Sequence, residues 1–193
     1  ILWVGPKRNI TYLFRNFKLK KLATCNFLYT ITTMIKKPEL FAPAGTLDGL
    51  KTAILYGADA VYAGLPGFSM RARAKITVDE MKDGIEFAHA NGKKVYLAFN
   101  LFAHDRDYAN LPRVSETINY MKPDALIVAD PGVMMWVKQN HPDMPIHVST
   151  QMNICSADTV KFWQNAGAEL CVFAREVTHP EFVEIRKKCP DVG

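Results

Sequence analysis

The sequence predicts an α/β fold, an incomplete (β/α) barrel of the TIM type with about six βα units over residues 34–193. Short apolar runs alternate there with amphipathic segments that end near Gly or Pro, which is typical of a parallel sheet with helical crossovers. The apolar runs start 19 to 36 residues apart, about the length of one βα unit. No G-x-G-x-x-G follows the first run, so the pattern favours a barrel over a dinucleotide-binding sheet.

The individual elements follow from the apolar runs and from helix-capping signals. Thr77 and Thr178 each precede a Glu three positions later, the pattern of a capping box at a helix start. Asp130 is followed by Pro131, which predicts an N-cap with proline at the first helical position. A closed barrel needs eight strands, so we expect an amino-terminal portion of a longer protein. Strands are expected at residues 39–42, 58–63, 94–100, 124–129, 146–150 and 169–174.

Residues 1–33 are expected to be a separate basic leader outside the fold. Eight of the 24 Lys and Arg precede residue 39, and the remainder carries 16 Lys and Arg against 19 Asp and Glu. Met34 resembles a natural start, which favours translated upstream sequence or an unrelated extension over an organelle-targeting segment or a nucleic-acid-binding arm. No run of ~18 apolar residues could span a membrane, and we expect a cytoplasmic protein.

The four cysteines, at positions 25, 155, 171 and 189, contain no C-x-x-C pair. They therefore predict neither a disulfide framework nor a metal site, and we expect free thiols with Cys171 buried in a strand. The chain also has no H-E-x-x-H, no G-x-S-x-G and no phosphate-binding P-loop. No motif therefore predicts a metallopeptidase or a serine hydrolase.

Barrel enzymes place their active sites at the carboxyl ends of the strands, where this chain carries polar residues. His147, Ser149 and Gln151 alternate onto one face of the fifth expected strand and are the candidate catalytic residues. Either a ligand site or a hydrogen-bonded core layer would satisfy such buried polar groups. Ser149 as a nucleophile beside His147 is a weaker alternative, because same-strand neighbours do not ensure hydrolytic geometry. Asp130 is interpreted as a helix cap rather than a catalytic acid.

Regularly spaced cations follow the second expected strand in the stretch GLPGFSMRARAK. Arg71, Arg73 and Lys75 share one side of an extended chain, and Arg175 follows the sixth expected strand. Guanidinium groups match carboxylates and phosphates, so we expect an anionic small molecule here, with a solvated edge or a local ion pair as alternatives. The candidate substrate-binding residues are Arg71, Arg73, Asn100, Asn153, Arg175 and Glu176.

Several blocks of the sequence resemble the collagenase-like peptidase family U32. In chain order they are KPELFAPAG from Lys37, YGADAVYAG from Tyr56, DALIVADPG from Asp124, PIHVSTQ from Pro145 and ARE from Ala174. The resemblance covers residues 36–192. Within it, the stretch from Tyr62 to Arg73 is similar to the tRNA uridine hydroxylation branch of the family.

This resemblance implies a barrel-type domain and two classes of activity. One is oxygen-independent hydroxylation of tRNA, ribosomal RNA or ubiquinone precursors, in which the tRNA branch uses prephenate as co-substrate. The other is the peptidase activity for which the family is named. Prephenate is a small dicarboxylate, so the resemblance suggests a ligand for the cations. Some members carry an iron–sulfur cluster, whose cysteines lie downstream of this region and are not matched by Cys155, Cys171 or Cys189. A non-catalytic fragment that only binds a partner is the third possibility.

Overall fold

The computed structural model describes residues 38–65, 69 and 76–193. The expected leader and the three cations Arg71, Arg73 and Lys75 lie outside the described residues. The chain divides into two compact units, Ile1–Glu39 and Leu40–Gly193. The fold below is that of the second unit. In the part of the chain that is described, no helix has both the length and the apolar character needed to cross a bilayer.

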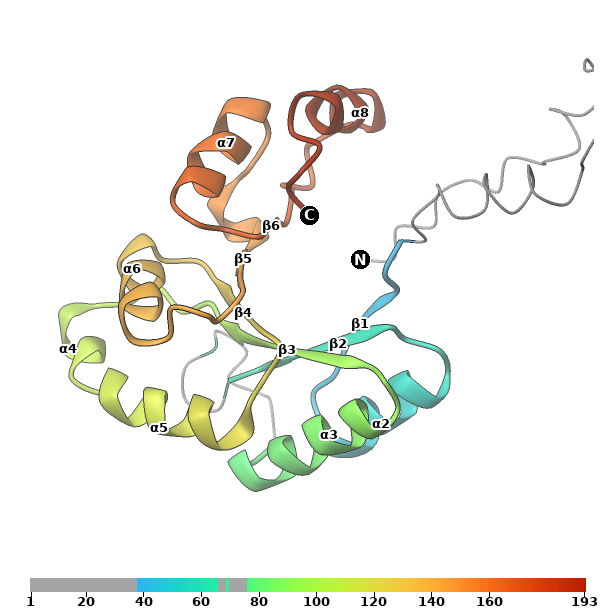
Figure 1. The fold of residues 1–193 in the computed structure, drawn as a ribbon, viewed down its shortest axis with the longest axis vertical. Coiled ribbons are helices and arrows are strands. Elements are labelled where there is room, and N and C mark those ends of the chain that lie inside the picture. Colours follow the sequence, from blue (N-terminus) through green and yellow to red (C-terminus); the bar gives the residue numbers. More distant parts are fainter. Residues whose placement is uncertain (1–37, 66–68, 70–75) are drawn as a thin grey trace, which may run out of the picture. The chain divides into compact units, whose positions relative to one another are not determined.

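A single sheet of parallel strands forms the centre of the second unit. Its strand order is β1-β2-β3-β4-β5-β6, and each strand pairs in parallel with the next one along the chain. Figure 1 shows the strands curving as part of a barrel wall, with the helices on the outside. The predicted fold class is therefore confirmed as six parallel strands of a half-barrel. The strands are β1 Phe41–Pro43, β2 Ala60–Gly64, β3 Lys94–Phe99, β4 Ala125–Val128, β5 Ile146–Val148 and β6 Leu170–Cys171.

The helices cover the outer face of the sheet, where α2 to α7 lie between consecutive strands and α8 follows β6 (Figure 1). Thr77 caps α3 as predicted, because its hydroxyl accepts from the Glu80 N–H at 3.2 Å while the Glu80 carboxylate accepts from the Thr77 N–H at 2.8 Å. The helices are α2 Leu47–Leu55, α3 Val78–Ala90, α4 Asp105–Tyr108, α5 Leu111–Met121, α6 Pro131–Asn140, α7 Ala157–Asn165 and α8 His179–Lys188, with a 3-10 turn η2 at Thr150–Met152.

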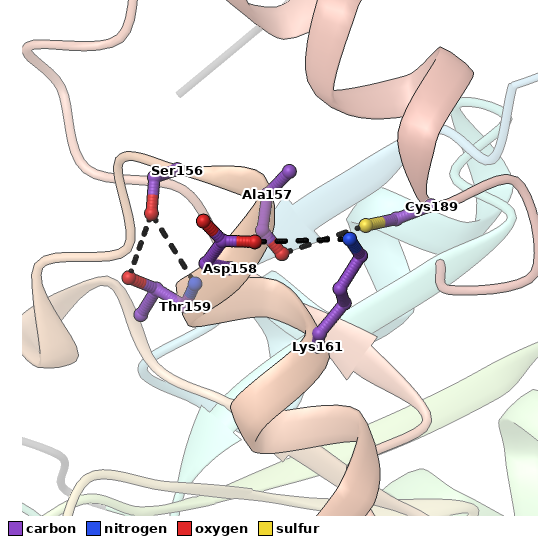
Figure 2. Close-up of polar contacts among 6 residues, drawn as sticks. All are labelled: Ser156, Ala157, Asp158, Thr159, Lys161 and Cys189. Carbon is purple, nitrogen blue, oxygen red and sulfur yellow. Dashed lines mark hydrogen bonds and ion pairs between the residues drawn. The ribbon is translucent and has the colours of Figure 1, made fainter.

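The start of α7 shows how neighbouring outer helices are joined. Ser156 is its N-cap, and its hydroxyl accepts from the Thr159 N–H at 3.2 Å (Figure 2). The Cys189 thiol, just after α8, donates to the Ala157 carbonyl at 3.6 Å and so links the end of α8 to the first turn of α7. Both cysteines of this region, Cys171 and Cys189, are buried free thiols, as predicted for Cys171.

Side chains of the strands alternate between the two faces of the sheet, as period-two geometry requires. One alternate set packs against the helices and forms the main apolar core, which includes Val61, Leu97, Phe99, Leu126 and Val148. The other set faces the inside of the barrel wall, where a second cluster is formed by Ala60, Tyr96, Ala125 and Ile127 with Phe41 and Tyr62 packed against it. The inner face is thus rich in aromatic rings.

Two aspartates fix the amino ends of the strands. Asp59 accepts from the Leu40 N–H at 3.0 Å and pairs with Lys93 at 2.9 Å, which ties the chain before β1 to the starts of β2 and β3. Asp124 accepts from the Val95 N–H at 2.7 Å and so ties β4 to β3. These contacts lie at the end opposite to the carboxyl ends, where barrel residues serve stability.

Each expected strand is longer in the prediction than in the structure, and β5 and β6 show how the carboxyl ends differ. β5 ends at Val148, because Ser149–Asn153 turn into η2, where the Met152 N–H donates to the Ser149 carbonyl at 3.0 Å. β6 ends at Cys171, and the chain beyond it bends until the Ala174 N–H reaches the Ile154 carbonyl at 3.0 Å. The period-two pattern continues past β5 through Ser149 and Gln151, and an apolar run continues past β6 through Ala174, so the local pattern alone cannot locate the two ends.

Candidate functional site

Four uncharged side chains form a hydrogen-bonded group at the carboxyl ends of the strands, which we call the strand-end network: Ser69, Asn100, Ser149 and Gln151. The Ser69 hydroxyl donates to Asn100 Oδ1 at 3.3 Å. Asn100 Nδ2 donates to Gln151 Oε1 at 2.8 Å, and the Ser149 hydroxyl donates to the same oxygen at 3.1 Å. The network brings together three predicted site residues and joins the chain after β2 to the ends of β3 and β5.

Local structure explains why these side chains meet. Asn100 directly follows β3 and Ser149 directly follows β5, so both lie at the same edge of the parallel sheet. The prediction that Gln151 continues the strand alternation is wrong, because Gln151 sits in η2 beyond the end of β5; its amide oxygen accepts from the Ser149 hydroxyl. Asn153 ends this turn in the left-handed region at φ 51°, a conformation that asparagine tolerates better than most residues. Its exposed side chain is not joined to the network.

His147 lies on the inner face one step below Ser149 on the same strand. It is opposite Ile127 on one side and Leu170 on the other, and its ring makes an edge contact with Tyr96 at a centroid distance of 4.6 Å. The side chain is 5% exposed. Burial, aided by the nearby positive charge of Lys94, lowers the pKa of His147 to about 4. The imidazole is therefore neutral at pH 7.

Ser149 and His147 do not form a nucleophile–base pair among the described contacts. The Ser149 hydroxyl donates to Gln151, and no hydrogen bond between described residues joins it to His147. A serine nucleophile needs a base that accepts its proton, so this arrangement does not support hydrolysis.

Aromatic rings continue from His147 across the inner face. Tyr96 contacts Phe41 at 5.3 Å between ring centroids, and Phe41 contacts Tyr62 at 4.6 Å. These distances are within the range of favourable aromatic pairs. Sequence reasoning missed these three rings and Ser69 as members of the site region. The sequence pattern could have identified the three rings, since each lies on an expected strand, on the face opposite the core positions.

Asp130 acts as the helix cap that the sequence predicts. Its carboxylate accepts from the Val133 N–H at 2.9 Å at the start of α6 and from the Tyr108 hydroxyl at 3.3 Å. Burial and the Asp130 carboxylate raise the pKa of Tyr108. Asp130 is thus engaged in holding α6 and the segment before α5 together.

The predicted anion-binding residues are only partly described. Arg71 and Arg73 lie outside the described residues, so their placement stays a prediction. Arg175 and Glu176 follow β6 on the exposed surface, and none of the ion pairs between described residues joins them. Their role in substrate binding also stays a prediction.

The described residues do not fit an iron–sulfur cluster. Such clusters need three or four thiolates. Over residues 38–65, 69 and 76–193, no group of three or more His, Cys, Asp or Glu side chains could hold a metal ion. Cys171 is a poor ligand, because burial and the neighbouring Cys189 raise the pKa of its thiol to about 11. No step of a reaction is therefore assigned to a cluster in this region.

The fold and the position of the network define a class of protein: a TIM-barrel-like α/β domain with a candidate site at the carboxyl ends of its strands. The model of peptidase family U32 matches residues 45–193. The chain therefore belongs to peptidase family U32, as its sequence blocks indicate.

Relatives within this family include RNA-modifying proteins. The chain is 44% identical over 157 residues to tRNA hydroxylation protein P of Escherichia coli K12, covering 81% of this chain and 35% of the relative. It is 33% identical over 147 residues to the 23S rRNA 5-hydroxycytidine C2501 synthase of the same organism, covering 76% and 22%. The chain thus spans about a third or less of the length of these two relatives.

A solved structure supports the fold. The U32 peptidase Mk0906 superposes with a TM-score of 0.63 at 16% identity, over 80% of this chain and 67% of that chain. At this identity the likeness shows the barrel-type fold alone.

Proposed function

We propose that the full-length protein is an RNA-modifying enzyme that hydroxylates carbon 5 of a tRNA uridine in the cytoplasm, with prephenate as co-substrate. The observation that carries the proposal is the strand-end network, which lies where barrel enzymes place their sites and contains no charged side chain. Enzymes that modify a base bind it by hydrogen bonds and by stacking, and both kinds of group are present here. The 44% identity to tRNA hydroxylation protein P supports the same proposal.

The proposed roles separate the base from the co-substrate. His147, Ser149 and Gln151 orient the reacting base or the donor, and Asn100 holds the Gln151 amide in place. The carboxylates of prephenate need cationic partners, which the network does not supply. We therefore assign them to Arg71, Arg73 and Arg175, with Asn153 and Glu176 as neighbouring polar groups.

Hydrolysis of peptide bonds is the alternative that the family description raises. No observation in the described residues favours it, because the Ser149 hydroxyl is directed to an amide oxygen rather than to a base. Peptide cleavage that disappears in Ser149→Ala would restore this alternative.

The direct test is to delete the gene and to quantify 5-hydroxyuridine derivatives in total tRNA by mass spectrometry. Deletion should remove these nucleosides and the full-length gene should restore them. In a reaction with purified protein and unmodified tRNA, formation of 5-hydroxyuridine should require added prephenate. Unchanged nucleosides in the deletion strain would refute the proposed function, whereas activity without prephenate would refute only the co-substrate.

A further inference from the structure

The segment that follows β6 is held against the turn that follows β5. The Thr150 hydroxyl in η2 donates to the Phe173 carbonyl at 3.0 Å, across a separation of 23 positions in the sequence. Close to this contact, the Ala174 N–H donates to the Ile154 carbonyl at 3.0 Å. One side-chain hydrogen bond and one backbone hydrogen bond therefore join the two segments.

Arg175 and Glu176 are the central residues of a tight turn that starts from this held segment. The Val177 N–H donates to the Ala174 carbonyl at 3.3 Å, which closes the turn. Ala174 before the turn is buried, and Thr178 after it is the N-cap of α8 in a capping box. The turn is thus held at both ends, and Arg175 at its tip is exposed.

A turn that is already held suits the capture of an anion by Arg175. Ordering a flexible loop on binding costs affinity, so a backbone that is fixed before the ligand arrives avoids this cost. None of the ion pairs between described residues includes Arg175, so its guanidinium has no carboxylate partner from that part of the chain. A guanidinium in a fixed position matches a carboxylate with two parallel hydrogen bonds.

Thr150 lies between two members of the strand-end network. Ser149 precedes it and Gln151 follows it, and the side chains of these two residues are hydrogen-bonded to each other at 3.1 Å. The Thr150 hydroxyl donates instead to the chain after β6. Residues 149–151 therefore contact both the network and the segment that leads to Arg175, so they determine how far apart the network and Arg175 lie.

We propose that Thr150 is a positioning residue, whose hydroxyl holds the turn that carries Arg175 so that the guanidinium binds a carboxylate of the co-substrate beside the strand-end network. Thr150 acts through Arg175 and is assigned no contact of its own with the substrates. This inference rests on the proposed function for the identity of the co-substrate. It adds the residue that fixes the position of the cation.

The first test is Thr150→Val in the full-length protein, since valine has nearly the shape of threonine and no hydroxyl. The KM for prephenate should rise by roughly threefold to tenfold, because a hydrogen bond that positions the binding group is lost. The KM for tRNA and kcat should stay within about twofold of the wild type, because the network keeps its hydrogen bonds. Thr150→Ser retains a hydroxyl and should restore the KM for prephenate.

An unchanged KM for prephenate in Thr150→Val overturns the inference. A KM for tRNA that rises as much as the KM for prephenate also overturns it, because Thr150 would then act through the network. A matched control is Thr117→Val, since the Thr117 hydroxyl also donates to a backbone carbonyl, that of Arg113 at 2.9 Å, but lies within α5 on the outer face of the sheet. This variant should keep both wild-type KM values.

A second test asks whether Thr150 acts through Arg175. Arg175→Ala should raise the KM for prephenate, and adding Thr150→Val to Arg175→Ala should raise it no further, because the positioned group is already absent. Additive effects of the two substitutions, or a wild-type KM in Arg175→Ala, overturn the inference.

The failure of this inference differs from the failure of the proposed function. A wild-type protein that depends on prephenate, and whose KM for prephenate is the same in Thr150→Val, overturns the inference and leaves the proposed function standing. A wild-type protein that hydroxylates no tRNA overturns the proposed function. The inference is then decided by calorimetric titration with prephenate: binding to the wild type that weakens in both Thr150→Val and Arg175→Ala supports it, and equal or absent binding overturns it.

Discussion

Replacing His147 by phenylalanine should change how the stability of the protein depends on pH. Phenylalanine keeps an aromatic ring beside Tyr96 but cannot bind a proton. In the wild type, the pKa of His147 falls from 6.5 to about 4 on folding, because the ring is buried and lies near Lys94. As the pH falls below 6.5, the unfolded chain therefore binds a proton that the folded protein does not, and the folded state loses stability.

The size of this effect follows from the shift in pKa. One pKa unit corresponds to 1.36 kcal/mol, so the wild type should lose about 2 kcal/mol from this residue by pH 5 and about 3 kcal/mol by pH 4. The loss begins near pH 6.5 and is complete below the folded-state pKa of about 4. His147→Phe should lack this part of the pH dependence, whatever its stability at pH 7.

The assay is urea denaturation followed by intrinsic fluorescence at several pH values from 7 to 4. Relative to that of His147→Phe, the free energy of unfolding of the wild type should fall by about 2 kcal/mol from pH 7 to pH 5 and by about 3 kcal/mol from pH 7 to pH 4. His147→Gln is the control, because it also cannot titrate and should parallel His147→Phe even if the two differ in stability. Parallel curves for the wild type and both variants would show that His147 is not a buried, neutral group.

Two further predictions concern packing and thiol reactivity. Gly132→Ala should lower the free energy of unfolding by about 1–2 kcal/mol, because the new Cβ would overlap the Tyr108 hydroxyl. Gly45→Ala is the control, since its Cβ would meet no atom within 4 Å, and it should be close to neutral. Equal stabilities of the two variants would contradict the close contact between Gly132 and Tyr108. A thiol reagent at pH 8 should modify exposed Cys155 in the native protein and leave Cys171 unmodified until urea is added, because Cys171 is buried and its pKa is raised to about 11. Mass spectrometry measures the modification of each cysteine. Equal modification rates of Cys155 and Cys171 in the native protein would exclude a buried Cys171.

The sequence by itself determined the succession of strands and helices in this protein. Capping by Thr77 and Asp130 depends on residues three positions away, and the alternation of His147 and Ser149 onto one face depends on strand geometry alone. Such patterns involve only residues close in sequence, so they can be recognised without knowledge of the neighbouring strands. They were sufficient to place the candidate site at the carboxyl ends of a parallel sheet.

Only the tertiary structure decided which of these residues meet. Asn100 and Gln151 are 51 positions apart, and their hydrogen bond depends on the β3–β4–β5 register and on the turn that ends β5 early. The neutral state of His147 likewise depends on burial beside Tyr96 and on Lys94, which comes from another strand. The physical reason is that hydrogen-bond geometry and desolvation depend on distances across the sheet, which the packing of the strands determines and local residue patterns do not specify.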